Sequence, residues 1–204
     1  MRVTHVITRL VVGGAQENTI ATVLGLRARH GVDARLVSGP TIGPEGTLED
    51  RVRQEPGVLT LAPNLIRAVH PLRDWLALGW LTREFRATRP DIVHTHSGKA
   101  GVLGRLAAKR AGVPLIIHTI HGPSFGGFQG PVANSVFTWA ERRAARVTDH
   151  FIAVSQAMID QYLTAGIGRP DQYSLIYSGF DLKPYSESVN DPELRAKLGF
   201  GPKD

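Results

Sequence analysis

Two short histidine motifs are the parts of this chain best equipped for chemistry. The first, HTH at residues 94–96, follows an apolar run, and the second, HTIH at residues 118–121, follows another apolar run. Imidazole can donate or accept a hydrogen bond, titrate near neutral pH and bind metal ions. The two motifs could therefore bind a polar ligand or supply nitrogen ligands to zinc.

The segments around these motifs predict a strand, a helix and a second strand. Ile92 and Val93 begin the first strand, residues 99–111 are helical, and Leu115–Ile117 form the second strand. Gly112 and Pro114 end the helix between them. Crossover connections return the chain in the same direction, so both strands end at one edge of a parallel sheet. Ligands of open α/β sheets bind at this edge, where four of the eight histidines are expected.

A glycine pair is the distant partner of these motifs. Gly13 and Gly14 lie between a predicted first strand, residues 3–8, and a predicted helix, residues 15–29. Glycines let a ligand approach the main chain, and the free N–H groups of a helix start favour anions. The spacing differs from the GxGxxG dinucleotide motif, and a tight turn is the commoner reason for such a pair.

Strands and helices alternate along the whole chain. Further strands are expected at 32–37, 58–61, 150–154 and 173–177, and further helices at 47–54, 71–87, 132–147, 156–165 and from 192 onward. Thr47 and Asp50 resemble a capping box, and Ser97 and Ser155 are expected helix N-caps. This alternation predicts an α/β fold of the Rossmann-like, doubly wound kind, with a mostly parallel sheet and helices on both faces.

Composition narrows the possible partners. The chain has 204 residues, no cysteine and a net charge of +6, which favours anionic ligands. Its few aromatic residues are not interleaved with basic ones, which argues against nucleic acid. No apolar run approaches the ~18 residues of a membrane span, and the N-terminus MRVTHVIT does not have the pattern of a signal peptide, so a cytoplasmic protein is expected.

Two basic features of the sequence could each face either an anionic partner or solvent. Trp139, Arg142, Arg143 and Arg146 share one face of a predicted helix, which could meet an anionic membrane or could be a solvated surface. The sequence SGKA at 97–100 lacks the other residues of a phosphate-binding loop. Lys99 therefore faces either an anion or water.

Five stretches, in this order, carry a family resemblance: GGAQ at 13–16, DIVHTHSGKAGVLGRLAAKRAGVP at 91–114, HTIHG at 118–122, FIAVSQAM at 151–158 and IYSGFDL at 176–182. They resemble the N-terminal half of family 4 glycosyltransferases, retaining enzymes with the two-domain GT-B fold. One position departs from the family, because Ser178 stands where asparagine is usual.

The resemblance implies a division of labour between two domains. In the family the N-terminal domain binds the acceptor, and the C-terminal domain holds most of the nucleotide sugar through residues that include an E-x7-E pair. That pair is absent from this chain. Residues 1–182 are thus expected to form the acceptor-side domain, and residues 183–204 the start of the connection to a second domain. The chain alone is expected to be inactive.

The resemblance also assigns roles to individual residues. It places Gly13 and Gly14 near the donor diphosphate, and His121 near the transferred sugar in a positioning and electrostatic role. His96, Lys99, Ser155 and Ser178 are assigned to a glycan or lipid-linked acceptor. His94 and His118 are expected to be buried and hydrogen-bonded. No cofactor or metal is implied.

Two other functions remain open from the residues. A metal-dependent hydrolase could use the HxH and HxxH motifs as zinc ligands, although neither motif contains a carboxylate. A binding module without catalysis is the third possibility. The sugar, the nucleotide and the acceptor are not fixed by fold or family.

Overall fold

The sheet is organised around β1 (Arg2–Ile7), whose residues from Val3 onward are all buried. The computed structural model describes residues 1–42, 44–96, 98–179, 186–187 and 191–201. Within these residues seven parallel strands follow in the order β3 (Leu59–Leu61), β2 (Asp33–Ser38), β1, β4 (Ile92–His96), β5 (Leu115–Ile120), β6 (His150–Ala153) and β7 (Tyr173–Leu175). The predicted Rossmann-like, doubly wound architecture is confirmed, and the sheet is entirely parallel.

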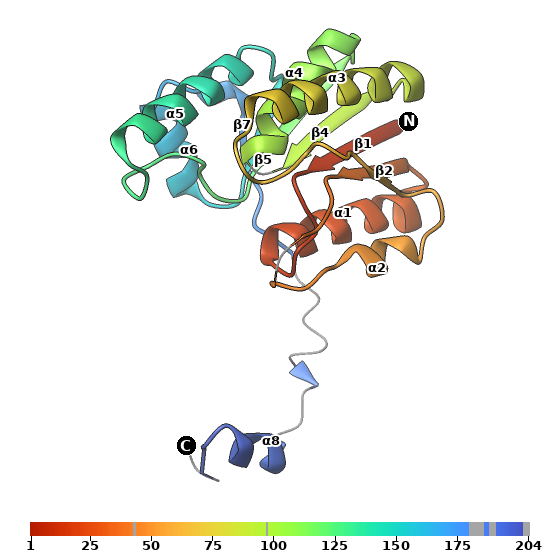
Figure 1. Cartoon of the computed structure of the whole chain (residues 1–204), viewed down its shortest axis with the longest axis vertical. Coiled ribbons are helices and arrows are strands. Elements are labelled where there is room, and N and C mark those ends of the chain that lie inside the picture. The colour runs from red at the N-terminus through yellow and green to blue at the C-terminus, as the bar shows by residue number, and fades with distance from the viewer. Residues whose placement is uncertain (43, 97, 180–185, 188–190, 202–204) are drawn as a thin grey trace.

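Helices connect the strands and lie on both faces of the sheet (Figure 1). They are α1 (Gly14–His30), α2 (Glu49–Arg53), α3 (Pro71–Thr88), α4 (Gly98–Ala111), α5 (Pro131–Ala145), α6 (Gln156–Thr164), the 3-10 turn η1 (Pro170–Gln172) and α8 (Pro192–Lys197). In Figure 1, α8 lies apart from the sheet. None of the described helices is long and apolar enough to cross a bilayer.

Glycine and proline set most helix ends, as the sequence predicts. Gly31 follows α1 with φ 60°, in the left-handed region that glycine adopts without strain. Pro71, Pro131 and Pro192 each occupy the first turn of a helix, where the missing N–H is not needed. Element positions therefore agree with the sequence to within a few residues.

Three details of the sequence prediction need correction or fall outside the described residues. The capping box is wrong, because α2 begins at Glu49 and Thr47 Oγ1 accepts a bond from the Glu49 N–H at 3.1 Å. Ser155 precedes α6 in an extended conformation but makes no side-chain cap bond. Ser97, and the predicted boundary at residue 182, lie outside the described residues.

Different helices pack against the two faces of the sheet. On one face, α1 and α2 pack over β1 and β2 through a cluster of buried apolar residues that includes Ile20, Val52 and Leu36. On the other face, α3 and α4 cover β1 and β4, and buried residues of α5 and α6 pack against β5 and β6. The helices α3, α4, α5 and α6 thus lie on the face opposite α1.

A buried ion pair joins α4 to α5 on this second face. Arg105 Nη2 lies 2.6 Å from Glu141 Oε2, and both side chains are essentially inaccessible to solvent. Ser124 Oγ donates to the other oxygen of Glu141 at 3.0 Å. The pair therefore ties the loop after β5 to the two helices behind it.

Candidate functional site

The site lies where the order of the strands reverses. β1 pairs with β2 on one edge and with β4 on the other, so the chain turns in opposite directions from this point. Crevices at the carboxyl ends of such strands are the usual ligand sites of open α/β sheets. The register places His5 of β1 directly beside His94 of β4.

Three histidines form a hydrogen-bonded chain from this point toward the carboxyl edge. His5 Nδ1 lies 2.9 Å from His96 Nε2, and His96 Nδ1 lies 3.0 Å from His121 Nε2. His121 directly follows β5 and is half-buried. Among the described residues, no bond to its Nδ1 is present, so this nitrogen is available to a ligand.

Burial keeps these rings neutral. Desolvation lowers the pKa of His5 to about 4 and the pKa of His121 to about 4. It also holds the pKa of His96 well below its usual range, with the neighbouring histidines adding to the effect. At neutral pH His121 therefore acts as an uncharged hydrogen-bonding group, and the bond to His96 fixes its orientation.

A groove of about 940 Å³ is lined by His94 and His96 and runs beside α1. One wall is α1 with small residues such as Ala21 and Gly25, and the other is the face of β4 to β6 that carries His94, His96 and Thr119. His94 Nε2 lies 2.7 Å from Thr119 Oγ1. The groove is therefore polar at its β4–β5 end.

His118 does not reach this site. Its side chain lies on the opposite face of the sheet, fully buried, with Nδ1 2.9 Å from Thr95 Oγ1. The ring lies so close to α4 that a Cβ added at Gly101 would be 2.6 Å from its Cε1. The expectation that four histidines share the ligand edge is thus wrong for His118, and His118 and His121 do not form one metal site.

The glycine pair stands at the N-terminus of α1. Gly13 is the cap residue, and among the described residues no side-chain cap bond is present at this helix start. Glu17 lies in the first turn and opposes an anion there. Arg9, a nearby cation by sequence, pairs with Glu45 at 2.9 Å.

Lys99 is engaged by the protein rather than by water. Its Nζ lies 2.6 Å from Asp74 Oδ1 and also donates to the carbonyl of Ala68. The ion pair links the start of α4 to the start of α3. A role for Lys99 in acceptor binding stays a prediction, and it would require sharing the ammonium with Asp74.

The two serines assigned to the acceptor are partly buried. Ser155 follows β6 and leaves its hydroxyl unused for capping. Ser178 lies after β7, and its neighbours Tyr177 and Gly179 line the groove. Of the residues that the family resemblance assigns to donor or acceptor, His96 lines the groove directly.

His5 is the site residue that the sequence analysis missed. It lies between the apolar Val3 and Ile7 on one face of β1, and it is completely buried. A histidine at an inward position of a predicted central strand is a signal that could have singled it out. Its partner, however, comes from a strand about ninety residues later in the chain.

Comparison with known proteins gives matches over most of the chain. The model of Glycosyltransferase Family 4 matches residues 12–184. The UDP-Gal:alpha-D-GlcNAc-diphosphoundecaprenol alpha-1,3-galactosyltransferase of Escherichia coli is 32% identical over 151 residues, which cover 74% of this chain and 38% of that protein. The chain spans half or less of the length of the curated relatives it matches.

Solved structures share the fold at low sequence identity. The lipopolysaccharide outer core galactosyltransferase WaaB, in its apo form, superposes with a TM-score of 0.64 at 14% identity, covering 89% of this chain and 47% of that one. The UDP-N-acetylglucosamine 2-epimerase of Rickettsia bellii gives a TM-score of 0.67 at 14% identity, covering 100% and 52%. Since the two differ in their named activities, these similarities establish the fold alone.

Proposed function

The chain belongs to glycosyltransferase family 4, and from this premise we propose that it is the acceptor-binding half of a retaining glycosyltransferase. The parent enzyme transfers a sugar from a nucleotide sugar to a glycan or a lipid-linked acceptor, in the synthesis of cell-surface polysaccharide or glycolipid. The donor is held mainly by a second domain.

The geometry of His121 is the observation that carries this proposal. The ring stands at the carboxyl end of β5, is neutral through burial, and is oriented by its bond to His96. Its Nδ1 can hydrogen-bond a sugar hydroxyl without changing the charge of the site. A preorganised group of this kind stabilises charge that develops in a transition state.

The reaction needs little covalent chemistry from the protein. The bond between the anomeric carbon and the diphosphate oxygen breaks, and a bond to the acceptor oxygen forms on the same face of the sugar. The leaving diphosphate accepts the proton of the acceptor hydroxyl. In this scheme Gly13 and Gly14 contribute main-chain N–H groups toward the diphosphate, while His121 orients the reacting sugar.

The surface of α5 supports a lipid-linked acceptor. Val132, Val136 and Trp139 are exposed and follow one another at helical spacing, and Phe128 is exposed in the preceding loop. Arg142, Arg143 and Arg146 extend this surface at the C-terminal end of the helix. Apolar and basic side chains in this arrangement suit the interface of an anionic membrane, at whose cytoplasmic face the parent enzyme would act. The acceptor named for the Escherichia coli relative is a diphosphoundecaprenol lipid.

The division of labour is tested by comparing the 204-residue chain with its full-length parent. We expect the parent to transfer sugar from a uridine or guanosine diphosphate sugar, and the isolated chain to show no turnover. The isolated chain lacks a wall for the base and ribose, and one half cannot close the reaction against water. Calorimetric titration should therefore show only weak binding of either nucleotide sugar.

Two results would contradict this division. Dissociation constants in the low micromolar range for the isolated chain would mean that the donor site is already complete. Measurable turnover by the isolated chain would have the same meaning. Circular dichroism of the isolated chain provides the control that it is folded.

A further inference from the structure

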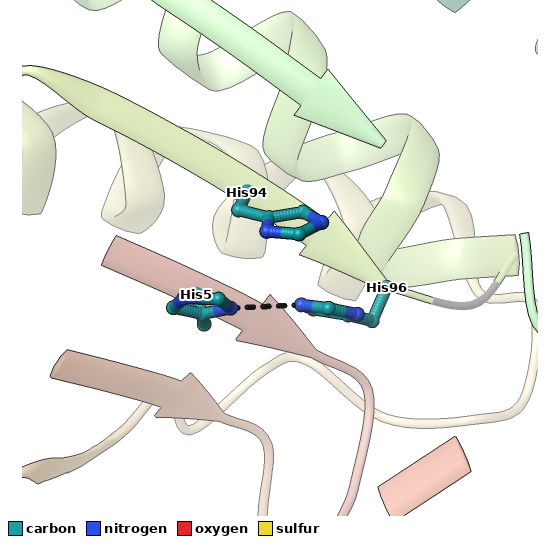
Figure 2. Close-up of side chains that lie close together, drawn as sticks. All are labelled: His5, His94 and His96. Carbon is teal, nitrogen blue, oxygen red and sulfur yellow. Dashed lines mark hydrogen bonds between the residues drawn. The ribbon is translucent and has the colours of Figure 1, made fainter. Parts of the chain in front are cut away.

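Three imidazoles meet beneath the proposed sugar site, at the boundary between β1 and β4 (Figure 2). One ring nitrogen each of His5, His94 and His96 lies within 4.8 Å of the others. His5 and His94 are paired in register, and His96 is two residues further along β4 on the same face. The cluster is therefore held by the two central strands of the sheet rather than by loops.

Hydrogen bonds on the outer side of the cluster select which nitrogens face inward. His94 Nε2 is bonded to Thr119 Oγ1, and His96 Nδ1 is bonded to His121 Nε2. These bonds leave His94 Nδ1 and His96 Nε2 for an inner partner. Metal-binding histidines are usually oriented in this way, by a bond from the second ring nitrogen to a neighbouring group.

One ring nitrogen of His5, Nε2, is buried and has no hydrogen-bond partner among the described residues. The other, Nδ1, faces His96 Nε2 at 2.9 Å. A buried polar atom left unpaired is unfavourable, because it loses its hydrogen bonds to water and gains none in return. The two nitrogens of one imidazole point in different directions, so one ion can bind only one of them. The observation that favours an additional ligand is therefore the convergence of three buried imidazoles, each offering one ring nitrogen.

We propose that His5, His94 and His96 bind one Zn²⁺ ion. Three imidazoles without carboxylate or thiolate suit zinc, copper or nickel and disfavour magnesium and calcium. Zn–N bonds of about 2.0–2.1 Å set the nitrogens of a tetrahedral site roughly 3.4 Å apart. Zinc would therefore replace the 2.9 Å hydrogen bond between His5 Nδ1 and His96 Nε2, and more widely separated nitrogens of the cluster, which lie within 4.8 Å, would move closer. His94 and His96 line the groove, which leaves the fourth position of the metal open to water or to an oxygen of a ligand.

This site shares His96 with the proposed sugar site, but zinc binding can be tested without any activity assay. Metal-free, tag-free 204-residue chain is titrated with ZnCl₂ in a calorimeter, and thermal unfolding is followed with and without zinc. We expect one high-affinity zinc per chain and a higher Tm, because a ligand that binds only the folded state stabilises it.

Three substitutions locate the ion. His94→Gln should abolish the stoichiometric binding, and Thr119→Val, which removes the partner that orients His94, should weaken it about 10–100-fold. His150→Gln should bind zinc like the parent. It is the matched control, since His150 is a half-buried histidine of β6 whose Nε2 is bonded to Ser174 rather than to the cluster.

The test substitutes His94 and Thr119 and leaves His5 unchanged. His5 is completely buried, so variants at His5 could fail to fold, and the test relies on the partly exposed His94 and on Thr119. The absence of stoichiometric zinc binding in the parent would overturn the site. Unchanged binding by a folded His94→Gln variant, or an equal loss in His150→Gln, would also overturn it.

Discussion

The coupled tautomers of His5, His96 and His121 make the outermost ring dependent on the innermost one. Each neutral imidazole has one donor and one acceptor nitrogen. If His96 donates from Nδ1 to His121, then His121 carries its proton on Nδ1, the nitrogen left free for a ligand. The opposite direction leaves a lone pair there. The proton on one buried ring thus decides whether His121 donates to or accepts from a sugar hydroxyl.

His121 itself is open to a direct test. In the full-length enzyme, His121→Ala should lower turnover by about 10²–10³, the usual effect of removing one preorganised donor near developing charge. The ring is only half-buried at the end of a strand, so the fold should survive. Steady-state transfer rates measure the effect, with His150→Ala as a control histidine on the same sheet face. Turnover near that of the parent in a folded His121→Ala variant would reject the role.

At the residue scale, the sequence located part of the candidate site. His96 and His121 could be found because each ends an apolar run, and strand ends of a parallel sheet share an edge. His5 could not be found in this way, since its partner depends on which strand is inserted beside β1. The separation of His118 from the others depends on the face to which it points, and the strand boundaries must be known to assign that face.

At the scale of elements, local sequence patterns were sufficient to predict the order of strands and helices along the chain. They were not sufficient to predict which elements pack against one another. The sequence predicted the alternation of strands and helices because glycine and proline mark the helix ends and apolar runs mark the strands. β7, expected to run to Tyr177, ends at Leu175. The contacts between elements were not visible, because they depend on residues distant in the sequence.

The contact of α4 with the sheet depends on its glycines. A Cβ at Gly104 would lie 2.7 Å from Thr95 Cγ2, and a Cβ at Gly101 would lie 2.6 Å from the buried His118 ring. Larger residues at these positions would force the helix away from β4 and β5. The conformational cost of glycine within a helix is thus offset here by close packing.

A pair of glycine substitutions tests this account. Gly101→Ala should destabilise the fold by about 1–3 kcal/mol through overpacking against His118. Gly79→Ala, in α3, meets no atom within 4 Å and should stabilise it by about 0.5–1 kcal/mol, the helix preference of alanine over glycine. Urea denaturation of both variants measures the difference. Similar shifts in the same direction would mean that α4 can move without strain.

At the scale of the whole molecule, exposed apolar side chains and basic side chains occur together on α5. The net charge is +6, and the exposed apolar residues of α5 lie next to a group of arginines on the same helix. Trp139 is 68% exposed, which is unusual for so large an aromatic side chain. A soluble surface gains nothing from this exposure, whereas a membrane interface would bury it.

Vesicle co-sedimentation tests this surface. The chain should bind vesicles that contain anionic lipid, and the binding should weaken as salt rises, because exposed charges are screened. Trp139→Ala and Arg143→Glu should reduce it, while Arg83→Glu, an equal charge change at an exposed position of α3, should have a smaller effect. Equal binding to neutral vesicles, or none to anionic ones, would discard the membrane role.

The central position of the first strand also has a consequence during translation. β1 leaves the ribosome before β2 and β4, and its edge toward β2 can pair once residue 38 has emerged. Its other edge needs β4, which ends at His96. At about 5–20 residues per second, that edge stays unpaired for roughly 3–12 s after residue 38 has emerged. The histidine at its middle, His5, is a polar residue on an otherwise apolar strand face, and it makes the waiting edge a poorer template for association with other chains.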